Sequence, residues 1–117
     1  MNLEEIKTER ERFFSRNGWM TPNNVNNLYH RVKDIDMRHE YDKVKEELRP
    51  AIGSHDPNIL FLYACALTED YIRDLEYGGY ENKTEKNQAI DIFKELQMLG
   101  YKNPEMYCRM AMLGMTK

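Results

Sequence analysis

Apolar residues recur along this chain at the three- and four-residue spacing that marks one face of a helix. The clearest case is residues 89–113, where the pattern predicts one helix, a stop at Gly100 and a second helix. Glycine can close a helix because it readily adopts the left-handed conformation. Asn103 and Pro104 then favour a new start, since asparagine caps free N–H groups and proline has none to leave unsatisfied.

The same reasoning predicts a single all-α domain over residues 1–117, with about six helices in antiparallel hairpins that form a compact helical bundle. The expected segments are an N-terminal helix in 1–17, a first hairpin in 22–49, a second hairpin in 57–100 and a C-terminal capping helix in 103–115. Helix two should run from 22 to about 35, helix three from 36 or 37 to 48 and helix four from 57 to about 75, with Pro50 ending helix three and Thr84 capping helix five. The apolar run after Pro57 places helix four at the centre.

A short glycine motif occurs before three of the predicted helices. Gly18, Gly53 and Gly100 each stand three residues before a Thr, Asp or Asn that is followed by proline. The separations between the copies fall in the range of helix-hairpin repeats, about 34 to 47 residues. The spacing therefore indicates a degenerate helical repeat.

Small, aromatic and glycine residues follow one another at helix-hairpin spacing between positions 59 and 100. They are Ala64, Cys65, Ala66, Leu67, Tyr71, Gly78, Gly79, Ala89, Phe93, Leu96 and Gly100. This pattern resembles the tetratricopeptide-like superfamily, and the Sel-like repeats in particular. The resemblance implies a right-handed array of hairpins, as an alternative to a plain bundle, and a protein-binding scaffold without chemistry of its own.

The resemblance also implies a concave side, lined by the first helix of each hairpin, where another protein or a peptide binds. On that basis the partner-binding residues are expected to be Asn23, Asn27, His30, Arg31, Tyr63, Asp70 and Arg73. The amides of the two asparagines offer both a donor and an acceptor to a bound backbone. A second interpretation stays open, in which the asparagines form only a solvated first turn.

The C-terminal helix carries apolar residues over more than half of its circumference, among them Met106, Met110 and Leu113. Two interpretations stay open. In one, this helix packs its apolar side against helix five. In the other, spare apolar surface meets a partner or a second copy of the chain, because the flexible methionine thioether suits an adaptable contact. A homodimer through this helix would follow from the second.

Composition narrows the classes of function. The chain is 32% charged and 41% hydrophobic, which suits a folded domain. No apolar run is long enough to span a bilayer and the charged N-terminus is unlike a signal peptide, so we expect a cytoplasmic protein without a membrane partner. The net charge of -3 argues against a nucleic-acid partner. Cys65 and Cys108 lie in apolar stretches and are expected to be buried free thiols.

The sequence offers no recognisable constellation for catalysis, for a metal or for a cofactor. His30, His39 and His55 fall in different segments, and Asp36 with His39 resembles only half of a di-metal carboxylate motif, without a second half. The cysteines lack zinc-ligand spacing, and no phosphate-binding glycine loop or nucleophile motif is present. We therefore expect no enzyme activity, no cofactor and no metal site.

Two functional hypotheses follow. The first is a non-catalytic protein-interaction module, an adaptor or scaffold built on the helical repeat. The second is a small inhibitor or regulatory protein, such as a phage- or mobile-element-encoded factor, that blocks an enzyme through an acidic surface from Glu69 to Glu81. Salt separates the two, because association through an acidic surface slows sharply with ionic strength and apolar association does not.

Overall fold

The structure is a computed structural model that describes residues 2–115. These residues form α-helices, one 3-10 helix and no strand, which confirms the predicted all-α class. The elements are α1 (Leu3–Arg16), α2 (Pro22–Met37), α3 (Tyr41–Leu48), the 3-10 helix η1 (Arg49–Ser54), α4 (Pro57–Gly78), α5 (Lys83–Met98) and α6 (Pro104–Met112). Residue 1 and residues 116–117 of the expected 1–117 domain lie outside the described residues.

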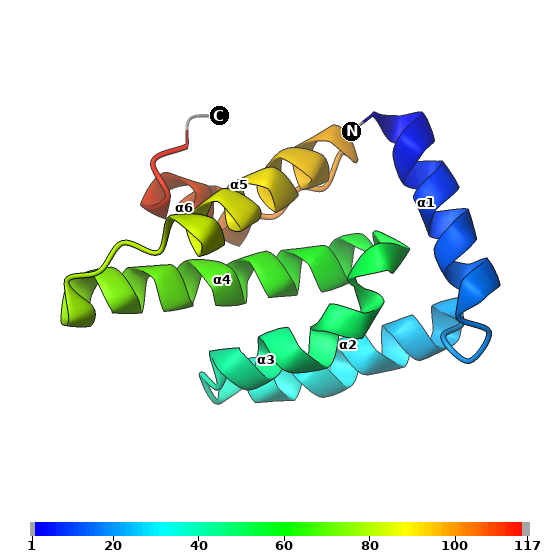
Figure 1. Ribbon diagram of the computed structural model, residues 1–117, viewed down its shortest axis with the longest axis horizontal. Helices are drawn as coiled ribbons and strands as arrows, with labels where there is room; N and C mark the ends of the chain where they lie inside the picture. Colours follow the sequence, from blue (N-terminus) through cyan, green and yellow to red (C-terminus); the bar gives the residue numbers. More distant parts are fainter. Residues whose placement is uncertain (1, 116–117) are drawn as a thin grey trace.

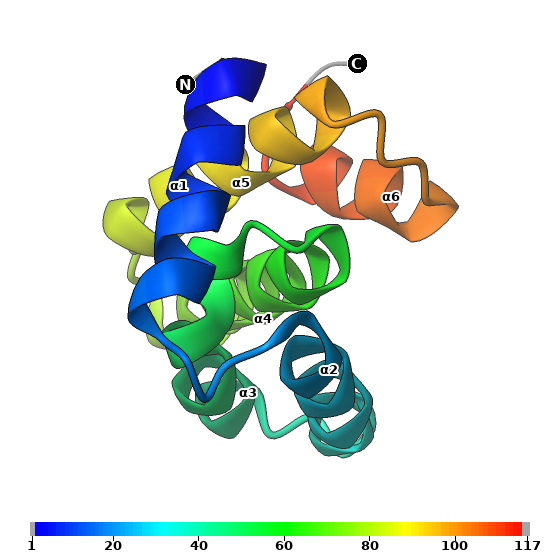
Figure 2. The same ribbon diagram turned by 90° about the vertical axis from the view of Figure 1, so that its right-hand side faces the viewer.

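The helices form layers around α4, the long helix in the middle of the molecule (Figure 1). Helices α2 and α3 both pack on one side of α4, and α5 and α6 pack on the other. The turned view in Figure 2 shows α1 crossing one end of this stack, where it packs on η1. Because α4 contacts all four helices of the two outer layers, its residues hold the fold together.

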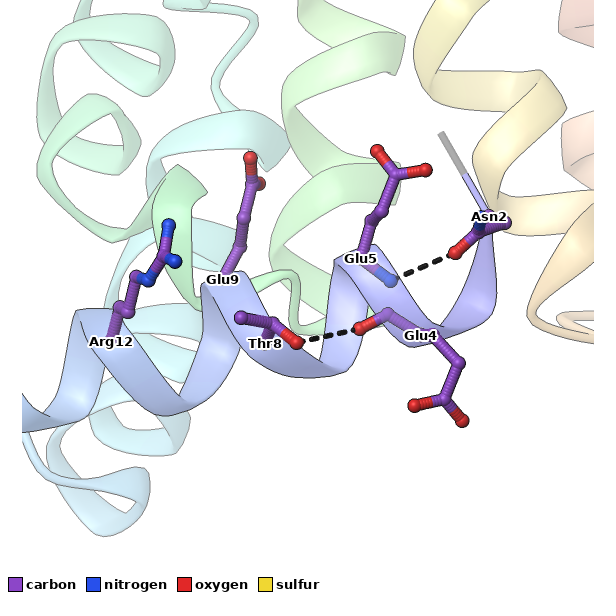
Figure 3. A pocket seen from close by; sticks show the side chains of 6 residues that line it. All are labelled: Asn2, Glu4, Glu5, Thr8, Glu9 and Arg12. Carbon is purple, nitrogen blue, oxygen red and sulfur yellow. Dashed lines mark hydrogen bonds between the residues drawn. The ribbon is translucent and has the colours of Figure 1, made fainter.

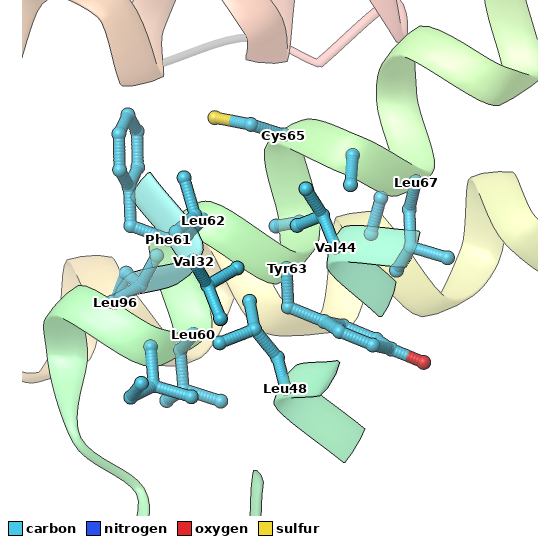
Figure 4. Close-up of a cluster of buried hydrophobic side chains, with 14 of the residues drawn as sticks. Val32, Val44, Leu48, Leu60, Phe61, Leu62, Tyr63, Cys65, Leu67 and Leu96 are labelled. Atoms are coloured by element: carbon cyan, nitrogen blue, oxygen red, sulfur yellow. The ribbon is translucent and has the colours of Figure 1, made fainter. Parts of the chain in front are cut away.

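Helix α4 is central because its first half is apolar on every side. Residues 59–67 are all buried, so this helix has no solvent-facing side over more than two turns. Val32 of α2 and Val44 and Leu48 of α3 gather against it from one layer (Figure 4). Phe93 of α5 belongs to the same core and is fully buried. Burial of apolar area contributes roughly 25 cal/mol per Å², so the packing of these apolar side chains around α4 is the main source of stability.

The turn between α2 and α3 lies elsewhere than predicted. Helix α2 continues to Met37, and α3 begins only at Tyr41. The chain reverses at His39, which has a left-handed φ of 61°, and its Nδ1 lies 2.9 Å from the Tyr41 hydroxyl. Met37, expected on the apolar stripe of helix three, is 71% exposed. The prediction was wrong because no glycine or proline marks this turn.

Helix α3 ends at Leu48, two residues before Pro50, as predicted. The chain tightens into η1, where proline sits in the first turn and its missing N–H leaves no bond unmade. His55, with a φ of 52°, then turns the chain into α4. Gly53 has no positive φ; a Cβ at this position would lie 2.8 Å from the Phe13 ring. This glycine therefore makes room for α1 and does not close a helix.

Other predicted helix-capping roles are also wrong. Asn82, and not Thr84, caps α5 through a side-chain bond to a first-turn N–H. Helix α1 ends at Asn17, and Gly18 after it has no positive φ. Of the three motif glycines only Gly100, with a φ of 78°, closes a helix in the left-handed conformation. The repeated motif therefore does not correspond to a repeated backbone turn.

Polar contacts around His55 tie α1 to the rest of the chain. The His55 ring lies between two carboxylates, with Nε2 2.6 Å from Glu9 of α1 and Nδ1 2.9 Å from Glu95 of α5. Arg10 adds a hydrogen bond of 3.0 Å to the Ser54 carbonyl. The Glu95 hydrogen bond raises the pKa of His55; burial lowers it, and the Glu9 hydrogen bond adds to the rise. The protonated ring therefore favours the docked position of α1.

We expect the stability that His55 provides to depend on pH. Its folded-state pKa lies above the unfolded value of about 6.5, so the contribution is complete below that pH and is lost as the pH rises through the folded pKa. His55→Gln should lower the free energy of unfolding by on the order of 1 kcal/mol at pH 6 and by less at pH 9. Urea unfolding at both pH values measures the difference. The exposed His30, changed to glutamine, is the control, and an equal effect of His55→Gln at both pH values would contradict the expectation.

Candidate interaction groove

A hollow of about 190 Å³ lies between α2 and α6, with α4 as its floor. We call it the α2–α6 groove. In Figure 2, α6 lies above α4 and α2 lies below it, both toward the right of the view. The groove is lined by Tyr29, Lys33, Asp36, Met37, Phe61, Leu62, Cys65, Asn103 and Glu105. Its walls thus come from the first helix of the first hairpin and from the last helix.

Helix α2 reaches the groove with a second stripe of residues beside its buried one. Tyr29, Lys33 and Asp36 are four and three residues apart and therefore share a face. Tyr29 and Asp36 are half-buried, and Lys33 is exposed. The sequence analysis missed these residues, although an aromatic and two charged residues at helical spacing along the edge of an apolar stripe are a readable signal.

The floor of the groove is apolar. Phe61 is 8% exposed and Cys65 is 4% exposed, and Figure 4 shows the Phe61 ring and the Cys65 sulfur on the opposite side of the cluster from Leu48. The Phe61 ring packs on Tyr101 with ring centroids 5.5 Å apart. Burial raises the pKa of the Cys65 thiol to about 12. The thiol is therefore protonated at neutral pH and lines the floor as a small apolar group, not as a nucleophile.

Asp36 is a carboxylate without a partner at the wall of the groove. Within residues 2–115 its side chain has neither a hydrogen bond nor an ion pair. Burial raises the pKa of Asp36, Arg109 opposes that rise, and Glu105 adds to it. Arg109 is itself held by Glu69 and, at 3.1 Å, by Glu105. The charge of Asp36 is therefore balanced only from a distance.

Other hollows lie along the outside of α1 or α5, and one of them reaches Gly53 of η1. The one in Figure 3 has a volume of about 330 Å³ and is lined only by α1 and its cap: Asn2, Glu4, Glu5, Thr8, Glu9 and Arg12. Figure 3 shows two local hydrogen bonds in it, from Glu5 N–H to the Asn2 side chain and from the Thr8 hydroxyl to the Glu4 carbonyl, and the Glu9 carboxylate is engaged by His55. A hollow along one helix offers no converging groups from other elements, so we do not place the site there.

The structure places the expected binding residues of α2 outside the groove. Asn23, Asn27 and His30 are exposed, and none of them lines it. Arg31 points to α3, where it pairs with Glu47 at 3.0 Å. The residues of α2 that do line the groove lie on the opposite edge of its apolar stripe, so the sequence pattern identified the helix and not the side.

The expected binding residues of α4 are largely buried. Tyr63 is 4% exposed and belongs to the core. Asp70 is 2% exposed, and its carboxylate lies 2.5 Å from Lys45 of α3 and 2.8 Å from Arg73. Only Arg73 of this set is exposed, and Asp70 already holds its guanidinium. These residues were expected at a surface because the resemblance places the first helix of each hairpin on a concave side; α3 and α5 cover this part of α4.

The apolar residues of α6 pack inside the fold. Met106, Met110 and Leu113 are 0%, 2% and 3% exposed, because α6 packs on both α4 and α5. The spare apolar surface from which we considered a homodimer is therefore not present at these three positions. Cys108 on the same helix is exposed, against the expectation of a buried thiol, whereas Cys65 is buried as expected.

Within the described residues, no group of three or more His, Cys, Asp or Glu side chains is placed to hold a metal ion. No helix there has the length and apolar character needed to cross a membrane. No protein-family model matches the sequence, and comparisons with curated proteins and with solved structures found no match. The resemblance to the tetratricopeptide-like superfamily therefore stays a prediction, and the function has to be argued from the groove.

Proposed function

We propose that this protein is a non-catalytic protein-interaction module that binds a segment of another protein in the α2–α6 groove. The observation that carries the proposal is a groove with an apolar floor and polar walls. The floor comes from α4, and the walls come from α2 and α6. Binding sites for other molecules combine apolar area with a few placed polar groups in this way. The floor thiol is protonated and Arg109 is engaged by two carboxylates, which favours binding over chemistry.

The arrangement of the hairpins supports the same proposal. Helices α2 and α3 stack on α4, and α4 and α5 stack on α6, so the first helices of successive units lie next to one another along one side. Repeat proteins build extended binding surfaces by stacking hairpins in this manner. The groove lies between two such first helices, where a partner segment would contact several elements at once.

The inhibitor hypothesis rests on an acidic surface from Glu69 to Glu81 that the fold partly covers, although Glu76 and Glu81 stay exposed. Asp70 is buried against Lys45, and Glu69 is paired with Arg109. Asp74 is half-buried. No observation in the structure favours this second hypothesis over the groove.

We expect truncation of the α2 wall to weaken peptide binding. A random library of short displayed peptides is selected on the immobilised protein, and the dissociation constants of selected peptides are then measured by fluorescence anisotropy. Tyr29→Ala/Met37→Ala should raise those constants by about tenfold or more, equivalent to about 1.4 kcal/mol, because it removes an aromatic wall and the exposed lip. Asn23→Ala/Asn27→Ala is the matched control on the same helix and should change them less than about twofold.

The outcomes separate the two sides of α2. Loss of binding in the asparagine variant alone would place the site on the outer side of α2 and overturn the groove proposal. Met37→Ala alone is the control for misfolding. Met37 is 71% exposed, so its truncation should leave the thermal midpoint unchanged. Equal binding to all of the variants would also overturn the proposal.

A further inference from the structure

The groove has a carboxylate, Asp36, that no side chain of the described residues contacts directly and that Arg109 and His39 stabilise only from a distance. Asp36 stands half-buried in its wall without a hydrogen bond or an ion pair. Burying a carboxylate away from a partner is unfavourable, and the raised pKa of Asp36 reflects that burial. A cation entering the groove would supply the missing partner. The second lining carboxylate, Glu105, lies on the facing wall and is engaged with Arg109 from one side.

Aromatic rings stand next to that charge. Tyr29 lines the same wall as Asp36, and Phe61, packed on Tyr101, lies in the floor. Aromatic faces attract cations, and they also accept the alkyl stem of a long cationic side chain. The groove already holds one such contact, since the ammonium of Lys33 lies 5.9 Å from the centre of the Tyr29 ring. The contact indicates that the Tyr29 ring accepts a cation. Lys33 would compete with an incoming cationic side chain for this ring.

We propose that the α2–α6 groove accepts a basic side chain, arginine or lysine, of the partner segment, with its charged head at Asp36 and its stem on Tyr29 and Phe61. This inference rests on the proposed function and specifies the chemistry of the partner. Charge complementarity selects this occupant: the lining carries two carboxylates and one ammonium, and the nearby guanidinium of Arg109 is neutralised by Glu69 and Glu105. A volume of about 190 Å³ suits one large side chain.

The test uses N-acetyl-arginine amide as the probe and N-acetyl-norleucine amide as the uncharged reference. Binding to the full chain is followed by NMR chemical-shift changes at Tyr29, Asp36 and Phe61 during titration. We expect the arginine probe to shift these resonances saturably in the millimolar range, the range of about 4 kcal/mol of binding free energy, and the norleucine probe to bind at least about fivefold more weakly.

Two variants should change the affinity for the arginine probe in opposite directions. Asp36→Asn removes the unpaired charge and should weaken binding about fivefold or more. Lys33→Gln removes the competing ammonium from Tyr29 and should strengthen binding about twofold, as the release of a weak exposed contact does. The control is Asp34→Asn, which makes the same change of charge on the outer side of α2, where Asp34 is exposed, and should leave the affinity unchanged.

The outcomes distinguish this inference from the function on which it rests. Equal chemical-shift changes with both probes would overturn the proposal that the groove accepts a basic side chain. So would an Asp34→Asn effect on the affinity as large as that of Asp36→Asn. The groove would still stand as a peptide site if selected peptides lose affinity in Tyr29→Ala/Met37→Ala. Absence of any saturable shift with the arginine probe would overturn the inference as well. If the groove variants leave the dissociation constants of the selected peptides unchanged, the proposed function itself is overturned.

Discussion

Replacing Phe93 with alanine should lower the free energy of unfolding by about 3 to 5 kcal/mol. Phe93 is fully buried in the core cluster on the inner face of α5. The helix backbones on either side of it cannot fully collapse, so the truncation loses the transfer free energy of the ring and leaves a cavity. Since domains of this size are stable by only about 5 to 15 kcal/mol, this one change should remove a large share of the total.

Urea unfolding followed by circular dichroism gives the measurement, and the slope against denaturant should stay unchanged if only the native state is affected. Met98→Ala on the same helix is the control. Met98 is 40% exposed, so its truncation should change the free energy of unfolding by less than about 1 kcal/mol. Wild-type stability of Phe93→Ala would mean that α5 does not pack on this face.

Replacing Lys45 with methionine should also lower the free energy of unfolding by about 3 to 5 kcal/mol, because it leaves a buried carboxylate without its closest partner. The Lys45 ammonium lies 2.5 Å from Asp70 of α4 and 3.3 Å from Glu85 of α5. The side chains of Lys45 and Asp70 are only 12% and 3% exposed. In the variant, Asp70 keeps only Arg73, at 2.8 Å from its carboxylate and 52% exposed.

The two pKa shifts in this pair show why removal of one partner is the sharp test. Burial acts to lower the pKa of Lys45, but the hydrogen bonds and charges of Asp70 and Glu85 outweigh it and raise that pKa. Burial raises the pKa of Asp70, Lys45 lowers it, and the neighbouring Asp42 carboxylate adds to the rise. The Lys45 ammonium is therefore stabilised by its partners. Burial of the Asp70 carboxylate is unfavourable, and Lys45 counteracts that cost.

A double-mutant cycle measures this coupling. Lys45→Met combined with Asp70→Leu removes both charges and should be markedly more stable than Lys45→Met alone, because no buried charge is left behind. Lys43→Met is the matched control, since it makes the same change at an exposed position of the same helix. If Lys45→Met and its combination with Asp70→Leu have the same stability, the loss in Lys45→Met does not come from an unpaired Asp70 charge.

Local sequence signals predicted most helix starts and missed turns that only packing stabilises. Asp56 and Asn103 cap α4 and α6 where the Asp-Pro and Asn-Pro pairs indicated, because capping depends on a few neighbouring residues. His39 and His55 adopt left-handed conformations without any glycine. Their cost, of order 1 to 3 kcal/mol, is offset by contacts with distant or adjacent side chains, and such contacts leave no mark in the local pattern.

The groove shows the same division at a larger scale. The apolar stripe of α2 and the buried run of α4 were readable from their spacing, because helical periodicity is a local property. Which edge of α2 meets α6 depends on how α4 seats both helices. The candidate site therefore moved from Asn23 and Asn27 to Tyr29 and Asp36, two positions that the chain brings beside residues of α4 and α6 only when it folds.

The amino-acid sequence by itself determined the all-α class, the presence of the helices and the central position of α4, since these follow from periodicity, capping residues and one long apolar run. Tertiary structure alone decided the burial of Asp70, Met106 and Met110 and the position of the groove. The physical reason is that charge and exposure are properties of a residue's surroundings: an acidic or methionine-rich helix face is a surface only until another helix covers it.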